Sequence, residues 1–283
     1  MDQTRTTLAT KQPAYTASAL AGSLDSSKLK GKPDLHNLAI AVARVARSQI
    51  ASFAGNLLVV FPLTYIFAAL YHMLFGIKIA EGIAAEKLLL DQHPWQSLAL
   101  LYACFTGFFL FVSGLIAGYI ENSVVYGKVP ERLKTHPVLS ATMSKKRLDK
   151  LVRLVKNSSG AFAGSVALGF FLGIAGPLGK IMGLPFDIRH ITISAGNTAI
   201  GFYGLDHQVS LGYLFTIISG VLMIGLLNFV VSFSFAFYVA VRSRGIRLKE
   251  YTEFFGILRR YFAKYPADFI RPPRDIRQAK DLA

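Results

Sequence analysis

Residues 211–241, LGYLFTIISGVLMIGLLNFVVSFSFAFYVAV, decide the fold, because this long apolar stretch contains no charged side chain. A helix needs about 20 such residues to cross the hydrocarbon core of a bilayer. Residues 50–76, 98–120 and 160–184 meet the same requirement, and Lys180 is the one charged side chain inside them. Four such stretches leave too little polar chain to cover them as core helices of a soluble protein. The sequence therefore predicts an all-α, polytopic membrane protein with four transmembrane helices.

The distribution of Lys and Arg gives these spans a direction. Residues 1–49, 121–159 and 242–283 contain seven, nine and eleven of these cations, whereas residues 77–97 and 180–210 contain two each. Cationic residues next to a span are retained in the cytoplasm. The pattern predicts a multi-pass protein of the bacterial inner (cytoplasmic) membrane, with both termini and the middle loop in the cytoplasm and the other two loops outside.

This topology divides the chain into three parts. We expect a cytoplasmic N-terminal segment over residues 1–49, a four-helix transmembrane domain over residues 50–241 and a basic cytoplasmic tail over residues 242–283. Pro62 lies inside the first span and predicts a kink there, because proline lacks the N–H group of a regular helical turn.

Two cytoplasmic segments have the pattern of amphipathic helices. In residues 144–156 apolar side chains recur on one side and cations on the other, including a basic patch of Lys145, Lys146, Arg147 and Lys150. Residues 248–262 repeat this arrangement. Such a helix either lies flat on an anionic membrane surface or packs against a partner helix.

The net charge of +15 and the pI of about 9.9 would ordinarily indicate nucleic acid as a partner. Here the cations gather on the predicted cytoplasmic side, where anionic membrane lipids attract each of them by about 1 kcal/mol. We therefore expect anionic lipids of the cytoplasmic leaflet as partners, with a protein partner or a homo-oligomer as further candidates. Nucleic acid is an alternative that no motif supports.

Small residues four apart are the clearest signal within the spans. They are Gly114 and Gly118, Gly160 and Gly164, and Gly179 and Gly183. This spacing lets helix backbones approach closely. Packing within one chain explains it as well as dimerisation does, and we favour the former, because four helices must first pack among themselves.

Asn56 and Asn228 place one amide each in the first and fourth spans. Hydrogen bonding between helices, worth roughly 0.6 to 2 kcal/mol, is the simpler interpretation of such residues. A polar pathway, as in a small transporter or channel subunit, is the alternative function. The absence of a carboxylate from all four spans argues against ion-coupled transport, which places ionisable groups near the midplane.

Residues 185–210 are unusually apolar for an external loop and could dip into the bilayer as a re-entrant piece. They contain a cluster of Asp187, Arg189, His190 and Asn197. Asp187 and His190 could be read as a metal or acid–base pair. Because two ligands do not make a metal site, we favour a structural pair of Asp187 with Arg189.

The search for catalytic motifs finds no phosphate-binding glycine loop, nucleophile elbow or carboxylate cluster in the sequence. The single cysteine, Cys104, excludes an intrachain disulfide and a cysteine-based metal site. We assign no catalytic residue, cofactor or metal ligand.

Three stretches resemble a known family. They are residues 7–22 (TLATKQPAYTASALAG), 187–197 (DIRHITISAGN) and 225–245 (GLLNFVVSFSFAFYVAVRSRG). The chain is similar to the C-terminal half of bacterial membrane proteins called the site-specific recombinase family (Gcr type). The resemblance implies a portion or a shortened member of a longer protein, and its name implies DNA recombination.

The residues disagree with that implied chemistry. Recombinases align a phosphodiester with a nucleophilic Ser or Tyr among several Arg and His side chains, whereas here only Arg47-Ser48 and Arg189-His190 echo such sets. We therefore expect an accessory or non-enzymatic member. A transporter subunit and a true recombinase acting through the cytoplasmic loops are the competing hypotheses.

Overall fold

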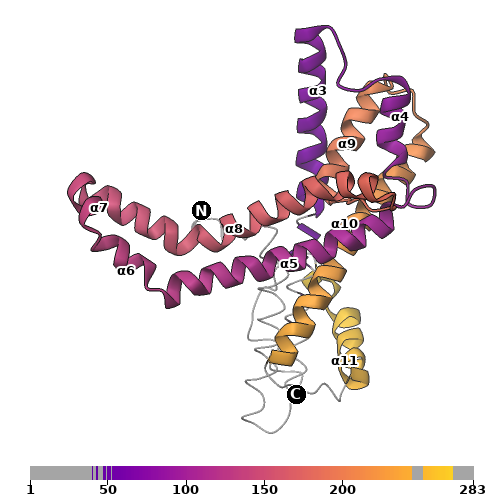
Figure 1. Ribbon diagram of the computed structural model, residues 1–283. Coiled ribbons are helices and arrows are strands. Elements are labelled where there is room, and N and C mark those ends of the chain that lie inside the picture. The colour runs from indigo at the N-terminus through magenta and orange to yellow at the C-terminus, as the bar shows by residue number, and fades with distance from the viewer. Residues whose placement is uncertain are drawn as a thin grey trace.

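The chain folds into helices throughout the part described by the computed structural model, which comprises residues 53–243 and 251–269 and the single residues 40, 43, 47, 48, 50 and 51. In chain order the elements are η2 (Asn56–Val60), α3 (Phe61–Phe75), α4 (Gly82–Leu90), α5 (Ala99–Tyr126), α6 (Val129–Lys134), α7 (Pro137–Thr142), α8 (Lys145–Met182), α9 (Ile191–Gly204), α10 (Leu211–Ser243), α11 (Tyr251–Lys264) and η3 (Pro266–Phe269) (Figure 1). The predicted all-α fold is confirmed.

Four helices are long and apolar enough to cross a membrane: Phe53–Phe75, Ala99–Tyr126, Lys145–Met182 and Leu211–Ala240. Each coincides with one of the predicted spans. Their outer faces expose many large apolar side chains, among them Phe67, Phe162 and Phe215. Water is an unfavourable solvent for so much exposed apolar surface, and lipid is a favourable one.

The first of these helices begins irregularly. Residues 53–55 are α-helical, residues Asn56–Val60 form a π-helix, η2, and regular α-helix resumes at Phe61, with Pro62 in its first turn. A proline cannot donate the backbone hydrogen bond of a regular turn, and a wider turn before it is one way in which a helix adapts. The irregularity therefore lies where Pro62 predicts one.

Helix α8 contains the amphipathic segment predicted at residues 144–156. It is continuous over 38 residues and joins this basic segment to the third span. No glycine or proline interrupts residues 145–159, so nothing in the backbone ends the helix where the polarity changes. Leu148 and Val152 on its apolar side are buried, and α6 packs beside α8. This segment thus packs against a partner helix of its own chain.

Helices α5 and α8 form a long antiparallel hairpin that is closed at its far end by α6 and α7 (Figure 1). Helix α10 crosses α5 near Gly107. A methyl group built on Gly107 would lie 2.7 Å from Cβ of Val231, so a side chain at this position would force the two helices apart. Beyond the crossing, the ring of Phe235 stacks on Phe111 and meets Phe108 edge-on.

Helix α9 lies within the predicted external loop and links the remaining parts. It packs against α3, α4 and η2 on one side and α10 on the other. Among the described elements it is the main neighbour of α3, which stands steeply to the α5–α8 hairpin in Figure 1. The direction of α3 relative to the hairpin therefore depends on α9.

The predicted N-terminal segment and basic tail meet each other. Tyr261 of α11 packs against Ala43, and the guanidinium of Arg47 donates to the carbonyl oxygen of Asp268 at 3.1 Å. Tyr261 also donates its hydroxyl to the Asp268 carboxylate at 2.6 Å. The apolar side of the tail helix is thus partly covered by the chain itself.

Candidate functional site

The segment between α8 and α9 enters the junction of α5, α9 and α10. Helix α8 ends at Gly183, whose φ of +62° is a left-handed conformation that glycine adopts without steric cost. The chain then runs without helical structure through residues 184–190. Its Phe186 carbonyl lies directly against Gly179, which leaves no room for a side chain there.

Arg189 is the centre of this junction. Its Nη1 donates to Oδ2 of Asp187 at 2.5 Å and to the carbonyl of Ile188 at 2.8 Å, while its Nε donates to the carbonyl of Asp91 at 3.1 Å. Nη2 lies 3.5 Å from the Asp91 carboxylate, and the ring of Tyr102 lies 5.4 Å from the guanidinium carbon. The side chain is only 14% exposed. The chain itself thus surrounds this cation with partners.

Side chains from two spans satisfy the backbone of the same segment. Thr106 of α5 accepts the Arg189 N–H at 2.9 Å. Asn228 of α10 donates to the Arg189 carbonyl at 2.9 Å and to the Ala103 carbonyl at 3.0 Å, and its Oδ1 accepts the Ile191 N–H at 3.2 Å. Non-helical backbone among apolar helices is stable only where such partners replace water.

His190 caps the start of α9. Its Nδ1 accepts the backbone N–H of Thr192 at 3.3 Å, which requires the unprotonated nitrogen. Burial lowers the pKa of His190 from 6.5 to about 4, because the charged imidazolium loses its hydration. The imidazole is therefore neutral near pH 7, with one nitrogen already occupied.

The structure brings together four of the predicted residues: Asp187, Arg189, His190 and Asn228. Asp187 binds Arg189 and the N–H of Ile188, at 2.8 Å, so its carboxylate is engaged as an ion-pair partner. Asn197 lies on α9 and is partly buried. The side chain of Asn56 falls outside the described residues. We call Asp91, Thr106, Asp187, Arg189, His190 and Asn228 the polar node.

The predicted packing glycines lie in different surroundings. A methyl group built on Gly160 would lie 2.5 Å from the Ala117 carbonyl oxygen, so α5 and α8 are in close contact there. Gly114 and Gly164 are buried within α5 and α8, whereas Gly118 faces open space. Gly179 packs against the 184–190 segment, and Gly183 ends α8.

The basic patch lies far from the polar node. Lys145, Lys146, Arg147 and Lys150 are exposed at the start of α8, beside the far end of α5. Thr106 and the end of α5 at Tyr126 are separated by 20 helical residues, or about 30 Å. The basic patch and the Arg189–His190 pair therefore lie in separate parts of the structure.

A second polar cluster, which the sequence analysis missed, fastens α3 to α9. His72 and Tyr203 are joined by a hydrogen bond of 2.9 Å, Tyr65 and His207 by one of 2.5 Å, and Lys78 binds the Asp206 carboxylate at 2.7 Å. Asp206 and His207 both have positive φ, of 52° and 65°. In the sequence, the signal for this cluster is the pair Tyr65 and His72, which are seven residues apart in a largely apolar span and therefore lie on the same face of α3.

The polar node can hold backbone in place, but its geometry does not favour catalysis or a polar pathway. Its amide, its guanidinium and its carboxylates form hydrogen bonds and ion pairs with one another and with backbone groups. In the described part of the chain, no three His, Cys, Asp or Glu side chains gather where they could hold a metal ion.

The chain was compared with protein families, with curated proteins and with solved structures. The family model described as site-specific recombinase matches residues 1–272. The searches of curated proteins and of solved structures give no match. Since the family match covers almost the whole chain, the protein belongs to the site-specific recombinase family.

Proposed function

We propose that this protein is an accessory, non-enzymatic inner-membrane member of the family, which holds DNA at the membrane through the basic end of its α5–α8 hairpin. Both termini and this hairpin end lie in the cytoplasm, as the distribution of cations indicates. The length of α8 is the observation on which the proposal rests.

Helix α8 is longer than a bilayer requires. Its apolar part, residues 160–182, measures about 34 Å and is enough for the hydrocarbon core. The preceding residues 145–159 extend the same helix by about 22 Å, beyond the head-group layer of roughly 5 to 7 Å. A rigid helix that projects this far presents its cations to the cytoplasm rather than to lipid head groups.

The projecting end is strongly basic. Residues 121–159 contain nine Lys and Arg against three carboxylates, and all nine cations are exposed. Three of them, Lys145, Lys146 and Arg147, occupy the first turn of α8, where the helix dipole disfavours positive charge. A phosphate backbone offsets both the mutual repulsion of these cations and the dipole.

The accessory role is supported by the distance between the two sites. The Arg189–His190 pair is enclosed by its own partners and lies about 30 Å along α5 from the basic end. A phosphodiester held by the basic end is therefore beyond its reach.

DNA binding is tested with the purified protein in nanodiscs of zwitterionic lipid and a labelled DNA duplex. We expect binding that weakens with salt, and replacement of Lys145, Lys146 and Arg147 by Gln should lower the slope of log affinity against log salt by about 2 to 3. The control removes three exposed cations of α11 by Arg259→Gln, Arg260→Gln and Lys264→Gln, with an unchanged slope expected. Absence of salt-dependent binding overturns the DNA role, and strand cleavage by the pure protein overturns the accessory role.

The orientation is tested by cysteine labelling, because the chain has a single native cysteine. In a Cys104→Ala background, Glu86→Cys and Gln208→Cys should react with a membrane-impermeant maleimide in intact cells. Ala141→Cys at the hairpin end should react only after lysis. All three positions are exposed in the structure, so an inverted pattern contradicts the proposed topology rather than reflecting burial.

A further inference from the structure

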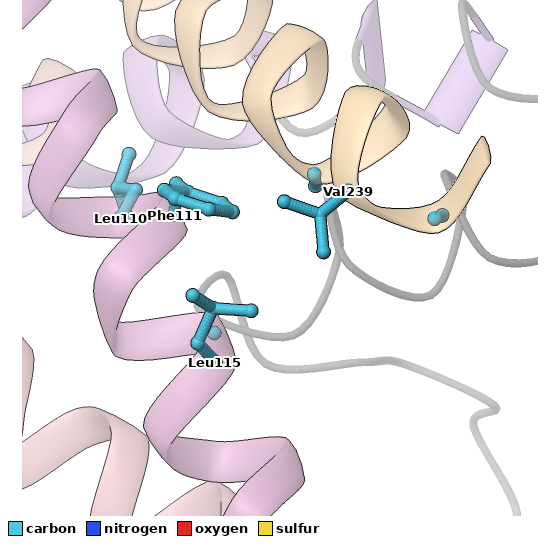
Figure 2. A pocket seen from close by; sticks show the side chains of 7 residues that line it. Leu110, Phe111, Leu115 and Val239 are labelled. Atoms are coloured by element: carbon cyan, nitrogen blue, oxygen red, sulfur yellow. The ribbon is translucent and has the colours of Figure 1, made fainter. Parts of the chain in front are cut away.

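An apolar groove opens between α5 and α10 on the cytoplasmic side of their crossing. It has a volume of about 150 Å³ and is lined by Leu110, Phe111, Gly114, Leu115, Ala236, Val239 and Ala240. Figure 2 shows Leu110, Phe111 and Leu115 of α5 and Val239 of α10 around the space between the two helices. None of these residues has a polar side chain that could hold water.

The groove exists because the two helices diverge. They touch at Gly107 and Val231 and are wedged by the ring of Phe235, which contacts both Phe108 and Phe111. Past this wedge the small side chains of Gly114, Ala236 and Ala240 leave the space between the helices unfilled. The groove therefore results from the way the two helices cross, because both continue beyond the contact at Gly107 and move apart.

The open end of the groove is marked by residues suited to the membrane interface. Tyr119 follows Leu115 by four residues on the same face of α5 and is 72% exposed. Arg242 follows Val239 by three residues on the same face of α10 and is exposed. Tyrosine and arginine at such a position bind at head-group depth, where their polar ends reach water and phosphate.

We propose that this groove binds part of one acyl chain of an anionic phospholipid of the cytoplasmic leaflet, whose phosphate group contacts Arg242. The lining selects an apolar chain, and the cation at its mouth selects a negative head group. A space of about 150 Å³ holds an apolar group the size of benzene. A single turn of a helix about 10 Å across has a larger volume than this space.

The inference rests on the proposed membrane orientation, because Arg242 must lie at the cytoplasmic leaflet. It does not depend on DNA binding, which involves the start of α8 and not the groove between α5 and α10. The variants of the groove are therefore also assayed for DNA binding. A variant that loses lipid retention but keeps the salt dependence of DNA binding shows that the two proposals are independent.

Native mass spectrometry of the detergent-purified chain tests this site. After exchange with phosphatidylglycerol we expect one retained lipid per chain, and at least tenfold weaker retention of phosphatidylcholine. Ala240→Phe fills the groove and should abolish retention of both lipids. Arg242→Gln keeps the groove and should reduce the preference for phosphatidylglycerol to within about twofold, in proportion to the single charge removed.

Matched controls place the same changes elsewhere. Val166→Phe enlarges an exposed apolar residue of α8, and Arg153→Gln removes an exposed cation of α8; both should retain the lipid like the unmodified chain. Leu115→Trp, at a half-exposed groove position, replaces Ala240→Phe if the latter loses its helical circular dichroism.

Three results overturn the proposal. The first is equal retention of both lipids by the unmodified chain. The second is unchanged phosphatidylglycerol retention in the groove-filling variant. The third is conversion of a dimer to a monomer by Ala240→Phe, which would identify a second copy of the chain as the occupant of the groove.

Discussion

The Asn228 side chain donates a hydrogen bond of 2.9 Å to the backbone carbonyl of Arg189, 39 residues earlier in the chain. The same amide group accepts the N–H of Ile191 and donates to the carbonyl of Ala103. A single residue in the middle of α10 therefore fastens the segment that precedes α9 to the helices on which it lies.

Replacing Asn228 by Leu should destabilise the fold by about 2 to 4 kcal/mol, because it leaves the Arg189 carbonyl and the Ile191 N–H unpaired among apolar helices. Thermal unfolding in detergent, followed by intrinsic fluorescence, measures the change. Asn122→Leu alters an exposed amide of α5 and should change stability by less than about 0.5 kcal/mol. Equal effects of the two substitutions would contradict the role assigned to Asn228.

Gly160 sets the distance between α5 and α8. Gly160→Ala should destabilise by about 1 to 3 kcal/mol, because the nearest atom to the new methyl group is the Ala117 backbone carbonyl oxygen, at 2.5 Å, which cannot move aside as a side-chain end can. Gly169, nine residues further along α8, faces open space. Gly169→Ala should be neutral or stabilise by up to about 1 kcal/mol through higher helix propensity. In unfolding experiments Gly160→Ala should lower the free energy of unfolding, whereas Gly169→Ala should not.

Stability should fall on acidification because of His190. Its pKa of about 4 lies below its ordinary value of 6.5, so the unfolded chain binds the proton first and the folded chain resists it. The contribution is complete above pH 6.5 and is lost as the pH falls toward 4, by at most about 3 kcal/mol. His190→Gln should flatten the unfolding temperature against pH across this window. An unaltered pH dependence would show that other groups cause it.

The attachment of α3 should depend on the hydroxyl of Tyr203. Tyr203→Phe removes the hydrogen bond to His72 and should weaken the contact of α3 with α9 by about 1 kcal/mol. Hydrogen exchange read by mass spectrometry should then show faster exchange over α3 and unchanged exchange over α8. Tyr126→Phe, at an exposed tyrosine, is the control.

The spans could be predicted closely from the sequence because lipid imposes a simple rule on them. The charge-free residues 98–120 lie within α5, and residues 211–241 coincide with most of α10. At α8 the change in polarity marks where the apolar part begins and not where the helix begins. Backbone hydrogen bonding continues through Ser159 regardless of whether lipid or water surrounds the helix.

The polar node was only partly predictable. Asp187 and Arg189 are two residues apart, so their pairing follows from proximity in sequence. The bonds of Arg189 to Thr106 and to Asn228 span 83 and 39 residues and involve backbone groups, which leave no periodic pattern in a sequence. Their partners depend on the crossing of α5 and α10 at Gly107, which is itself a tertiary feature.

The composition of the polar node also determines when the fold can be completed. Its residues come from the end of α4, from α5, from the segment before α9 and from the middle of α10. During synthesis the α5–α8 hairpin is made before Asn228. Thr106 is then available to the Arg189 N–H, whereas the Arg189 carbonyl and the Ile191 N–H still lack the side chain that binds them. The hydrogen bonding of this segment can therefore begin on α5 and is completed only when α10 has been added.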